Sequence, residues 1–369
     1  MINSYAFRIL ANQRLRLILT VCGVALCVIL MLFLLAVYGG VREGAIEYID
    51  QNKADLWVLQ QNSWNILRGT SLLSTGHGRA LMQIPGVESA SPVLLLLPGI
   101  QRKEKNATVF LAGYEPASGL GGPPHLIHGR SVLTDDEIVL DKAFAARLQV
   151  TLGDTVMIKG EPLQVVGISE GTNAFVIQYA FVTLQRAQYV GGLSTLVSCY
   201  LVKVRKGHSL EDVSEGIREG LPGVEIYDHP TFLENNIQEM ESGILPLLFI
   251  IAAIGAIVLT AILSLLLSVS ILERRKDFAV MKTLGSPKYF LPRTVLEQAL
   301  IIAGLGCGLG LALFFPMCRF IELITPEMEP QSSVFHVLFT LVSVGIISFV
   351  SSLISIQKLR RIYPLEVFA

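Results

Sequence analysis

Four long apolar runs constrain this chain more than any other feature of its sequence. They cover residues 17–38, 244–272, 295–317 and 334–356. Each run is long enough to cross about 30 Å of hydrocarbon as a helix. Hydrophobic residues make up 52% of the 369 residues and charged residues only 16%, a balance that a water-soluble chain could bury only with difficulty. The sequence therefore predicts a membrane protein with four helical spans.

The distribution of charge predicts the orientation of these spans. The first 16 residues contain three arginines and no acid, residues 273–293 contain six basic and two acidic residues, and the tail after residue 356 has three basic residues against one acid. Residues 318–333 have one arginine and three glutamates. Because basic loops favour the cytoplasmic side, we expect both termini and the middle loop in the cytoplasm, and residues 41–243 outside.

These patterns divide the chain into eight parts. We expect an inner-face helix with the first span (1–40), an outer domain with stalk helices (41–243) and a second span (244–272). A cytoplasmic loop (273–293), a third span (294–317), a short outer loop (318–333), a fourth span (334–356) and a cytoplasmic tail (357–369) follow. The first span is too long for a signal peptide and lacks a persuasive cleavage site, so it is interpreted as a retained anchor. Helical segments at 42–52 and 231–242 are either stalks or simple linkers.

The outer segment repeats one order of elements. A strand, a helix and a strand are expected at 55–60, 75–83 and 87–97, and again at 199–205, 209–221 and 224–227. The predicted fold class is thus a four-span α-helical bundle plus an α+β extracytoplasmic domain, in which split βαβ halves flank a strand-rich insertion at about 99–184. Residues 119–128 are so rich in Gly and Pro that we expect no regular structure there.

Composition excludes several kinds of site in the outer segment. Its 16 basic and 23 acidic residues argue against nucleic acid as a partner. Cys199 is its single cysteine, so a disulfide within the segment is excluded, and we expect a buried strand residue. His77, His125 and His128 lack the spacing and acidic or thiol partners of a zinc site. No Ser, His and Asp arrangement can be inferred from the order of the residues, which disfavours an enzyme.

A cluster of large apolar residues in the outer segment has two interpretations. Trp57, Trp64, Ile66 and Leu67 lie within eleven positions of one another. Such residues usually form core, but exposed together they would line a groove for a lipid or an acylated cargo.

The most charged stretch of the chain is 273–287, ERRKDFAVMKTLGSP, between the second and third spans. Phe278, Met281 and Leu284 recur at a spacing of three and would share one side of a short helix. Gly285 suits the end of that helix, and the following Ser-Pro suits the start of the next. The stretch is either a short helix across the inner mouth of the bundle or a charged loop that only sets topology.

The third span carries two features of its own. Gly304, Gly306, Gly308 and Gly310 form two overlapping GxxxG spacings, which allow close contact either with the chain's own helices or with a second subunit. Glu297, at the start of the span, could pair with Arg293 one turn earlier or with a basic residue of the inner loop, and such a structural ion pair is favoured over a proton-carrying role.

Several stretches carry a resemblance to a known family. ERRKDFAVMKTLGSP, VLEQALIIAGLGCGLGLAL and LRRIYPLEVFA resemble the membrane part of FtsX/MacB-type permeases of ABC transporters. IPGVESASPVL, GRSVLTDDEIVLDKAFAARLQVTLGDTV and LQVVGISEG resemble the periplasmic core domain of that family. The resemblance covers nearly the whole chain, and the outer segment is similar to that of the DevC-like exporters.

The resemblance implies a permease subunit that is not itself an enzyme. The chain lacks a GxxxxGK[ST] phosphate loop, so ATP and magnesium are expected on a separate ATPase, and no cofactor is expected here. The family's coupling helix, which contacts that ATPase, corresponds to positions Arg275, Lys276, Phe278, Met281, Leu284 and Gly285. Asp277 and Thr283 stand where the family often has Glu and Ala, and Pro287 follows Ser286 directly. These departures leave that role intact but make the end of the helix less distinct.

The resemblance also implies partners and a task. We expect two permease copies, or this chain with a close homologue, on an ATPase dimer in the bacterial inner membrane, together with membrane lipid and, as in DevC-like systems, a periplasmic adaptor and an outer-membrane duct. The expected task is export or extrusion of a hydrophobic or amphipathic substrate. The alternative is a regulator that transports nothing and activates a periplasmic partner such as a cell-wall hydrolase. An anchored enzyme would need catalysis by residues 41–243.

Overall fold

The computed structural model describes residues 14–66, 69, 71–103, 105–174, 177–273, 276, 280, 287, 289–324 and 332–360. The chain divides into two compact units. The helical unit comprises Met1–Tyr38, Leu245–Phe320 and Pro330–Ala369, and the β-rich unit comprises Gly39–Ile244 and Ile321–Glu329.

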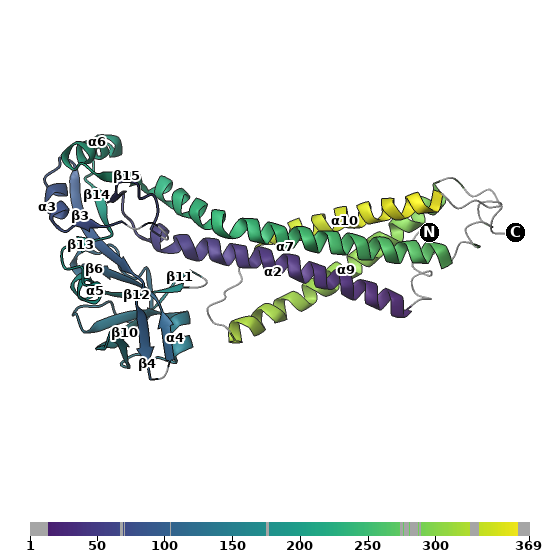
Figure 1. Ribbon diagram of the computed structural model, residues 1–369, viewed down its shortest axis with the longest axis horizontal. Helices are drawn as coiled ribbons and strands as arrows, with labels where there is room; N and C mark the ends of the chain where they lie inside the picture. Colours follow the sequence, from purple (N-terminus) through teal and green to yellow (C-terminus); the bar gives the residue numbers. More distant parts are fainter. Residues whose placement is uncertain are drawn as a thin grey trace. The chain divides into compact units, whose positions relative to one another are not determined.

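Four long helices supply the helical unit, and Figure 1 shows them gathered in one bundle, with the third crossing the first at an angle. They are α2 (Arg14–Gln51), α7 (His229–Glu273), α9 (Phe290–Ile324) and α10 (Val334–Arg360). Their candidate membrane spans are Arg14–Gln51, Leu245–Glu273, Pro292–Ile324 and Val334–Gln357. The prediction of a four-span helical bundle is confirmed. Pro246 and Pro316 lie inside α7 and α9 without ending them.

The core of the helical unit takes residues from all four helices. Val28, Leu263, Phe314 and Val344 represent α2, α7, α9 and α10 in one buried apolar cluster. Many other apolar side chains point outward, such as Ile257, which is 68% exposed. An apolar exterior around satisfied helical backbones is the arrangement that lipid requires.

Hydroxyl groups connect α7 and α10 inside this apolar bundle. The Ser351 Oγ donates to the carbonyl of Thr260 at 3.3 Å, and the Ser355 Oγ donates to the carbonyl of Ser264 at 3.1 Å. Small residues that donate across a helix pair allow the backbones to approach closely.

The β-rich unit begins and ends with the predicted strand–helix–strand repeats. The first repeat is β1 (Leu56–Gln60), α3 (Gly76–Leu81) and β3 (Val87–Leu96), and the second is β14 (Cys199–Val204), α6 (Leu210–Gly220) and β15 (Val224–Asp228). The four strands lie in the order β15-β1-β14-β3, with every neighbouring pair antiparallel. This is the order of split βαβ units, so that prediction is confirmed.

The two helices of these repeats cover one part of the sheet. Leu81 of α3 and Ile217 of α6 join Val58 and Val202 of the strands in one buried cluster. Figure 1 shows α3 and α6 beside β3, β14 and β15. The Ser209 Oγ accepts a hydrogen bond from the N–H of Glu211 at 3.2 Å and caps α6.

The insertion between β3 and β14 extends the same sheet. Its elements are β4 (Gly99–Arg102), β5 (Lys105–Thr108), β6 (Phe110–Tyr114), η1 (Pro116–Ser118), β7 (His125–Gly129), β8 (Glu137–Asp141), α4 (Lys142–Leu148), β9 (Thr155–Ile158), β10 (Glu161–Glu170), β11 (Asn173–Ala174), β12 (Ile177–Thr183), α5 (Leu184–Gly191) and β13 (Leu196–Val197). From β3 the sheet continues through β6, β12, β8, β10, β9, β4 and β5, while β13 pairs with β2 (Leu73–Ser74) in a separate ribbon.

Strand β3 joins the two parts of this sheet. Its early residues pair with β14, and Val93–Leu96 pair with β6. Because one strand serves both partners, the split βαβ part and the insertion share a continuous hydrogen-bonded framework.

The expectation of irregular structure over 119–128 was wrong at its end. His125–Gly129 form β7, which pairs antiparallel with β10. Leu126 and Ile127 suit a strand, and the neighbouring β10 supplies backbone partners that local composition does not reveal. Gly129 has φ 79°, and a Cβ there would lie 2.1 Å from the Val166 carbonyl oxygen, so the close approach of these two strands requires glycine.

Candidate functional site

The stretch between the second and third spans contains the proposed coupling residues. Lys276 is helical and exposed. The positions Arg275, Phe278, Met281, Leu284 and Gly285 lie outside the described residues. The amphipathic helix therefore stays a prediction.

Two ion pairs flank the stretch between the second and third spans in the sequence. Glu273, the last residue of α7, accepts two hydrogen bonds from Arg16 of α2: one from Nη1 to Oε2 at 2.7 Å and one from Nη2 to Oε1 at 2.6 Å. Such a two-point contact holds the planar guanidinium and carboxylate in one orientation. In α9, the Arg293 Nε donates to the Glu297 Oε1 at 3.0 Å, which is the pairing expected for Glu297. The Arg16–Glu273 pair was not foreseen, because its members are 257 positions apart.

The glycines of the third span separate into two pairs. A Cβ on Gly306 would lie 2.5 Å from the Cβ of Val24, and one on Gly310 would lie 2.8 Å from the Cβ of Val28, so this pair packs against α2. A Cβ on Gly304 or Gly308 would meet nothing within 4 Å. Gly306 and Gly310 therefore allow contact within the chain, as one of the two interpretations expected. Gly304 and Gly308 face open space.

The end of α2 holds a loop of the β-rich unit. The Tyr48 hydroxyl donates to the carbonyl of Gly121 at 3.0 Å, and the N–H of Gly121 donates to the Asn52 Oδ1 at 2.7 Å. Tyr48 also stacks on Tyr179 with 4.8 Å between ring centroids. Gly121 has φ 82°, and a Cβ there would lie 2.5 Å from a Val93 methyl group. Both hydrogen-bonding groups of one buried backbone unit are thus bound by the helix.

The first turns of α7 hold a second loop in a similar way. The side chain of Asn236 is fully buried; its Oδ1 accepts from the N–H of Ile66 at 3.1 Å, and its Nδ2 donates to the carbonyl of Phe232 at 2.7 Å. The Asn65 Nδ2 donates to the Glu239 Oε2 at 3.5 Å. Neither this loop nor the Gly121 loop was identified from the sequence, where a buried asparagine among polar residues carries no distinguishing signal.

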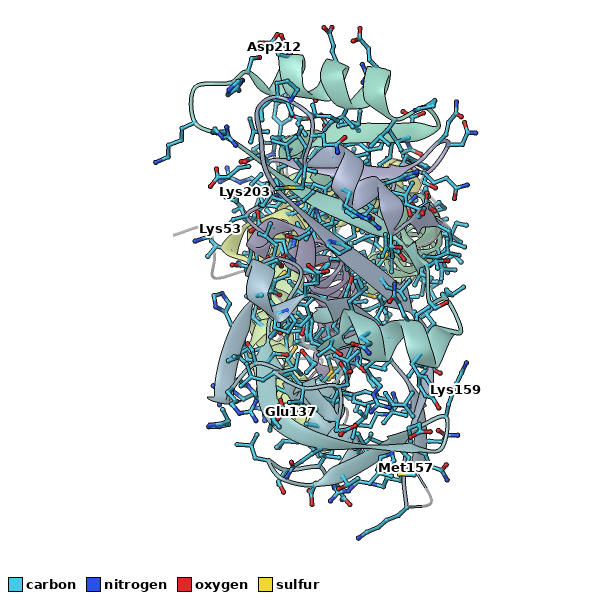
Figure 2. All side chains as sticks on the ribbon, turned by 90° about the vertical axis from the view of Figure 1, so that its left-hand side faces the viewer. Lys53, Glu137, Met157, Lys159, Lys203 and Asp212 are labelled. Carbon is cyan, nitrogen blue, oxygen red and sulfur yellow. The ribbon has the colours of Figure 1, made fainter. Side chains whose placement is uncertain are left out.

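Two open depressions adjoin these two loops. The polar groove is about 570 Å³ and is lined by Lys53, Glu88, Lys203 and much of the Gly- and Pro-rich segment 116–124. Figure 2 shows Lys53 and Lys203 close together. The neutral groove is about 330 Å³ and is lined by parts of the 65–72 loop, by Leu95–Leu97, and by Phe110 and Ser198.

The large apolar residues of the 57–67 region have different environments. Trp57 is fully buried and stacks on Phe232 of α7 at 4.6 Å between ring centroids, so it belongs to the core. Ile66 is 6% exposed and lines the neutral groove, while Trp64 is 39% exposed. Leu67 lies outside the described residues. Trp57 is therefore core, whereas the interpretation as a groove for a lipid or an acylated cargo stays a prediction.

Among the described residues, the histidines and the cysteine of the β-rich unit do not assemble into a chemical site. His125 and His128 are exposed on β7, and within the described ranges no three His, Cys, Asp or Glu residues come together as metal ligands. Cys199 is fully buried on β14, as expected, and burial raises the pKa of its thiol to about 12. A thiol that stays protonated is a poor nucleophile.

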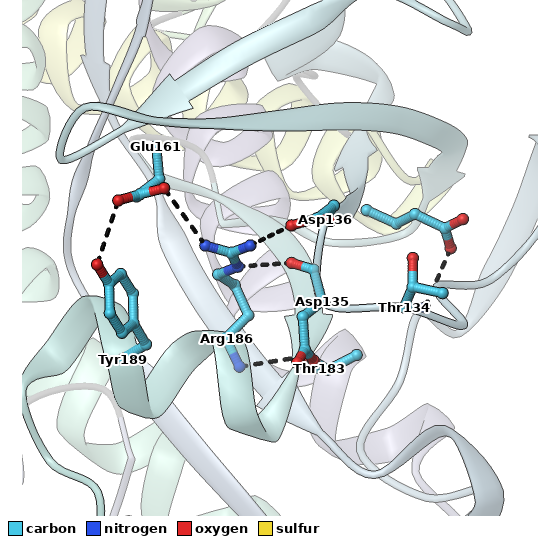
Figure 3. A network of polar contacts seen from close by, with 8 residues as sticks. Thr134, Asp135, Asp136, Glu161, Thr183, Arg186 and Tyr189 are labelled. Atoms are coloured by element: carbon cyan, nitrogen blue, oxygen red, sulfur yellow. Dashed lines mark hydrogen bonds and ion pairs between the residues drawn. The ribbon is translucent and has the colours of Figure 1, made fainter.

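The acidic residues of the GRSVLTDDEIVLD stretch serve the fold. Arg186 of α5 donates from Nε to the Asp135 carbonyl at 2.5 Å and from a terminal nitrogen to the Asp136 carboxylate, and the Thr183 hydroxyl donates to the Asp135 carboxylate. Figure 3 shows this network together with Glu161, which contacts Arg186 and accepts from the Tyr189 hydroxyl at 3.2 Å. These contacts attach α5 to the segment before β8.

Glu137 anchors the other side of the same segment. Its carboxylate accepts from Arg130 at 2.7 and 2.5 Å and from the N–H of Leu133 at 2.8 Å. The hydrogen bonds from Arg130, with those from the backbone, lower the pKa of Glu137 from 4.5 to about 2. A carboxylate that stays ionised near neutral pH and accepts all these hydrogen bonds is a structural group and a poor proton carrier.

Comparison with protein families finds two matches that together cover most of the chain. The MacB-like periplasmic core domain matches residues 17–219, and the FtsX-like permease C-terminal domain matches residues 249–364.

Individual relatives are similar over comparable lengths. An uncharacterized ABC transporter permease of Mycobacterium tuberculosis is 27% identical over 327 residues, which cover 85% of this chain and 86% of the relative. The probable export ATP-binding/permease protein MacB of Pseudomonas entomophila is 21% identical over 392 residues, which cover 98% of this chain and 57% of that protein. Among solved structures, the periplasmic region of MacB from Actinobacillus actinomycetemcomitans aligns with a TM-score of 0.40 and 16% identity, covering 52% of this chain and 96% of that one.

Proposed function

Because this chain belongs to the FtsX/MacB-type permeases of ABC transporters, we propose that it couples ATP hydrolysis by a separate ATPase to movement of its β-rich unit. That movement exports or extrudes a hydrophobic or amphipathic substrate. The 369 residues contain no GxxxxGK[ST] loop, which supports placing ATP and magnesium on the partner.

The observation that carries this proposal is the continuity of α2 and α7. Each is a single helix that includes a candidate span and continues to residues that bind loops of the β-rich unit. Tyr48 and Asn52 bind the Gly121 backbone, and Asn236 binds the Ile66 backbone. A helix is stiff along its axis because its backbone hydrogen bonds run in that direction. A displacement of either span can therefore be passed along the helix toward the bound loop.

The proposed assembly follows from family and charge. Two copies of this permease, or one with a close homologue, bind an ATPase dimer through residues 273–293. The basic flanks of the spans favour cytoplasmic termini in a bacterial inner membrane, with the β-rich unit in the periplasm. A periplasmic adaptor and an outer-membrane duct complete the proposed export route.

The test is affinity purification of the intact chain in mild detergent, followed by mass spectrometry and an ATPase assay. We expect an ATPase to co-purify with the wild type and to be lost in a Phe278→Asp, Met281→Asp double variant. The matched control is Leu133→Asp, Leu152→Asp, which places the same two charges at exposed leucines of the β-rich unit.

Each outcome of this purification decides something. Loss of the ATPase in the coupling variant alone supports the proposal, and loss in both variants contradicts the assignment of the coupling residues. Recovery of a cell-wall hydrolase with no substrate-stimulated ATPase activity would replace export by the regulatory alternative. Absence of any ATPase from the wild type would overturn the mechanism.

A further inference from the structure

The neutral groove differs in chemistry from the surface around it. Segment 41–243 carries 16 basic and 23 acidic residues, yet none of the described residues that line this groove is charged. Its lining includes Leu72 and Leu97, which are 43% and 55% exposed, and Phe110, which is 8% exposed. Leu95 and Leu96 also line it and are half-buried.

The hydroxyl groups in the groove are already occupied. The Ser71 Oγ donates to the Ser198 carbonyl at 2.5 Å and accepts from the N–H of Gln60 at 2.9 Å. The Ser198 Oγ accepts from the N–H of Leu95 at 3.0 Å. A polar ligand would give up hydrogen bonds to water on entering and could not replace them with these hydroxyl groups, which already bind the protein. An apolar ligand makes no such hydrogen bonds to water and therefore has none to replace.

We propose that the neutral groove binds one hydrocarbon chain, such as the acyl chain of a lipid-like or acylated substrate. Its volume of about 330 Å³ lies at the lower end of small-molecule pockets, roughly 300–1,000 Å³, which suits one chain better than a two-chain lipid. The leucines provide apolar contact, and the charged headgroup stays in water. This inference rests on the proposed export function, for which it names a substrate site.

One wall of the groove is attached to α7. Asn65 and Ile66 line the groove and are the two residues held by Glu239 and Asn236. One part of the groove lining thus belongs to the loop that α7 binds, and another part is Leu95–Leu97 at the end of β3. A shift of α7 relative to the sheet changes the width of the groove, which links the bound chain to the helix that continues into the second span.

The test uses the full chain in lipid nanodiscs and a lysophosphatidylcholine whose 12-carbon chain carries a photoreactive diazirine. After irradiation and proteolysis, we expect labelled peptides that contain Leu72 or Leu95–Leu97. Leu97→Asp should reduce that labelling about tenfold. Leu133→Asp, at a leucine that is 68% exposed elsewhere in the β-rich unit, should leave it unchanged.

The design distinguishes loss of probe binding from loss of folding and from failure of the export mechanism. If Leu97→Asp lowers the unfolding temperature, Leu72→Asp, at another exposed leucine of the groove, replaces it. Equal labelling of the groove peptides in wild type and variant, or labelling confined to the four spans, would overturn the inference. The labelling experiment contains no ATPase, so its result is independent of the co-purification experiment. If the groove is labelled but no ATPase co-purifies, the export mechanism alone is refuted. If an ATPase co-purifies but the groove is not labelled, the groove proposal alone is refuted.

Discussion

The buried side chain of Asn236 accepts a hydrogen bond from the backbone N–H of Ile66 at 3.1 Å, across 170 positions of sequence. The same amide group donates to the carbonyl of Phe232 one turn earlier in α7, at 2.7 Å. Because both ends of the amide are bound, its orientation is set, and the loop at Ile66 is attached to the helix. This contact connects α7 with the neutral groove.

Replacing this amide should loosen the loop. Asn236→Leu keeps a similar volume but leaves the N–H of Ile66 buried without its acceptor, at a cost of about 1–3 kcal/mol. That cost corresponds to a fall in unfolding temperature of roughly 2–10 °C. Tryptophan fluorescence of the intact chain measures the unfolding of the β-rich unit, since both tryptophans, Trp57 and Trp64, belong to that unit.

The neighbouring asparagine provides the control for that substitution. Asn235 is half-buried on the same turn of α7, and Asn235→Leu should change the unfolding temperature by no more than a surface substitution does. Equal effects of the two variants would show that the Asn236 contact contributes nothing specific.

The glycine pairs of α9 should differ in their tolerance of a methyl group. Gly306→Ala places a Cβ 2.5 Å from that of Val24, so α2 and α9 must separate, at a cost of about 1–3 kcal/mol. Gly304→Ala meets open space and should be neutral or slightly stabilising. The temperature at which detergent-solubilised protein loses its monodisperse elution peak measures both, and an equal loss in the two variants would refute the assignment of faces.

Stability in acid should depend on Glu137. Its pKa is about 2 in the folded protein against an ordinary 4.5, so its contribution is complete above pH 4.5 and is lost as the pH falls toward 2. At pH 7, Glu137→Gln should lower the stability of the β-rich unit by about 2 kcal/mol, because charge-assisted hydrogen bonds from Arg130 and the backbone are weakened. The difference between variant and wild type should shrink between pH 4.5 and 3.

Tryptophan fluorescence over that pH range tests this expectation. Glu170→Gln is the control, because Glu170 forms an exposed ion pair with Lys142 at 3.3 Å that should contribute less than about 1 kcal/mol. A difference for Glu137→Gln that stays constant down to pH 3 would contradict the role assigned to its charge.

The pair Arg16–Glu273 should behave as a reciprocal contact between α2 and α7. Glu273→Arg places two positive charges together and should lower the temperature at which the elution peak is lost. The exchanged double variant Arg16→Glu, Glu273→Arg should recover most of that loss, because the pairing is restored with its direction reversed. Failure of the exchange to rescue would indicate that each residue acts through other neighbours.

Much of the architecture follows from local sequence. Four apolar runs require helical spans because a bilayer leaves backbone groups no other partner, and alternating strand and helix patterns placed β1, α3, β3, β14, α6 and β15 within a few residues of where they lie. The resemblance of the 273–287 stretch to a coupling helix also came from sequence alone. These features are encoded by residues close to one another in the chain.

Tertiary structure alone decided which surfaces and contacts these elements form. The GxxxG spacing is the same for both glycine pairs of α9, and only the position of α2 makes Gly306 and Gly310 a contact and leaves Gly304 and Gly308 open. Strand β7 forms in a Gly- and Pro-rich region because β10 pairs with it. Asn236 and Ile66, Arg16 and Glu273, and the serines of the neutral groove are brought together across 127 to 257 positions. Local composition determines the elements, whereas complementary packing between distant segments determines where a site can exist.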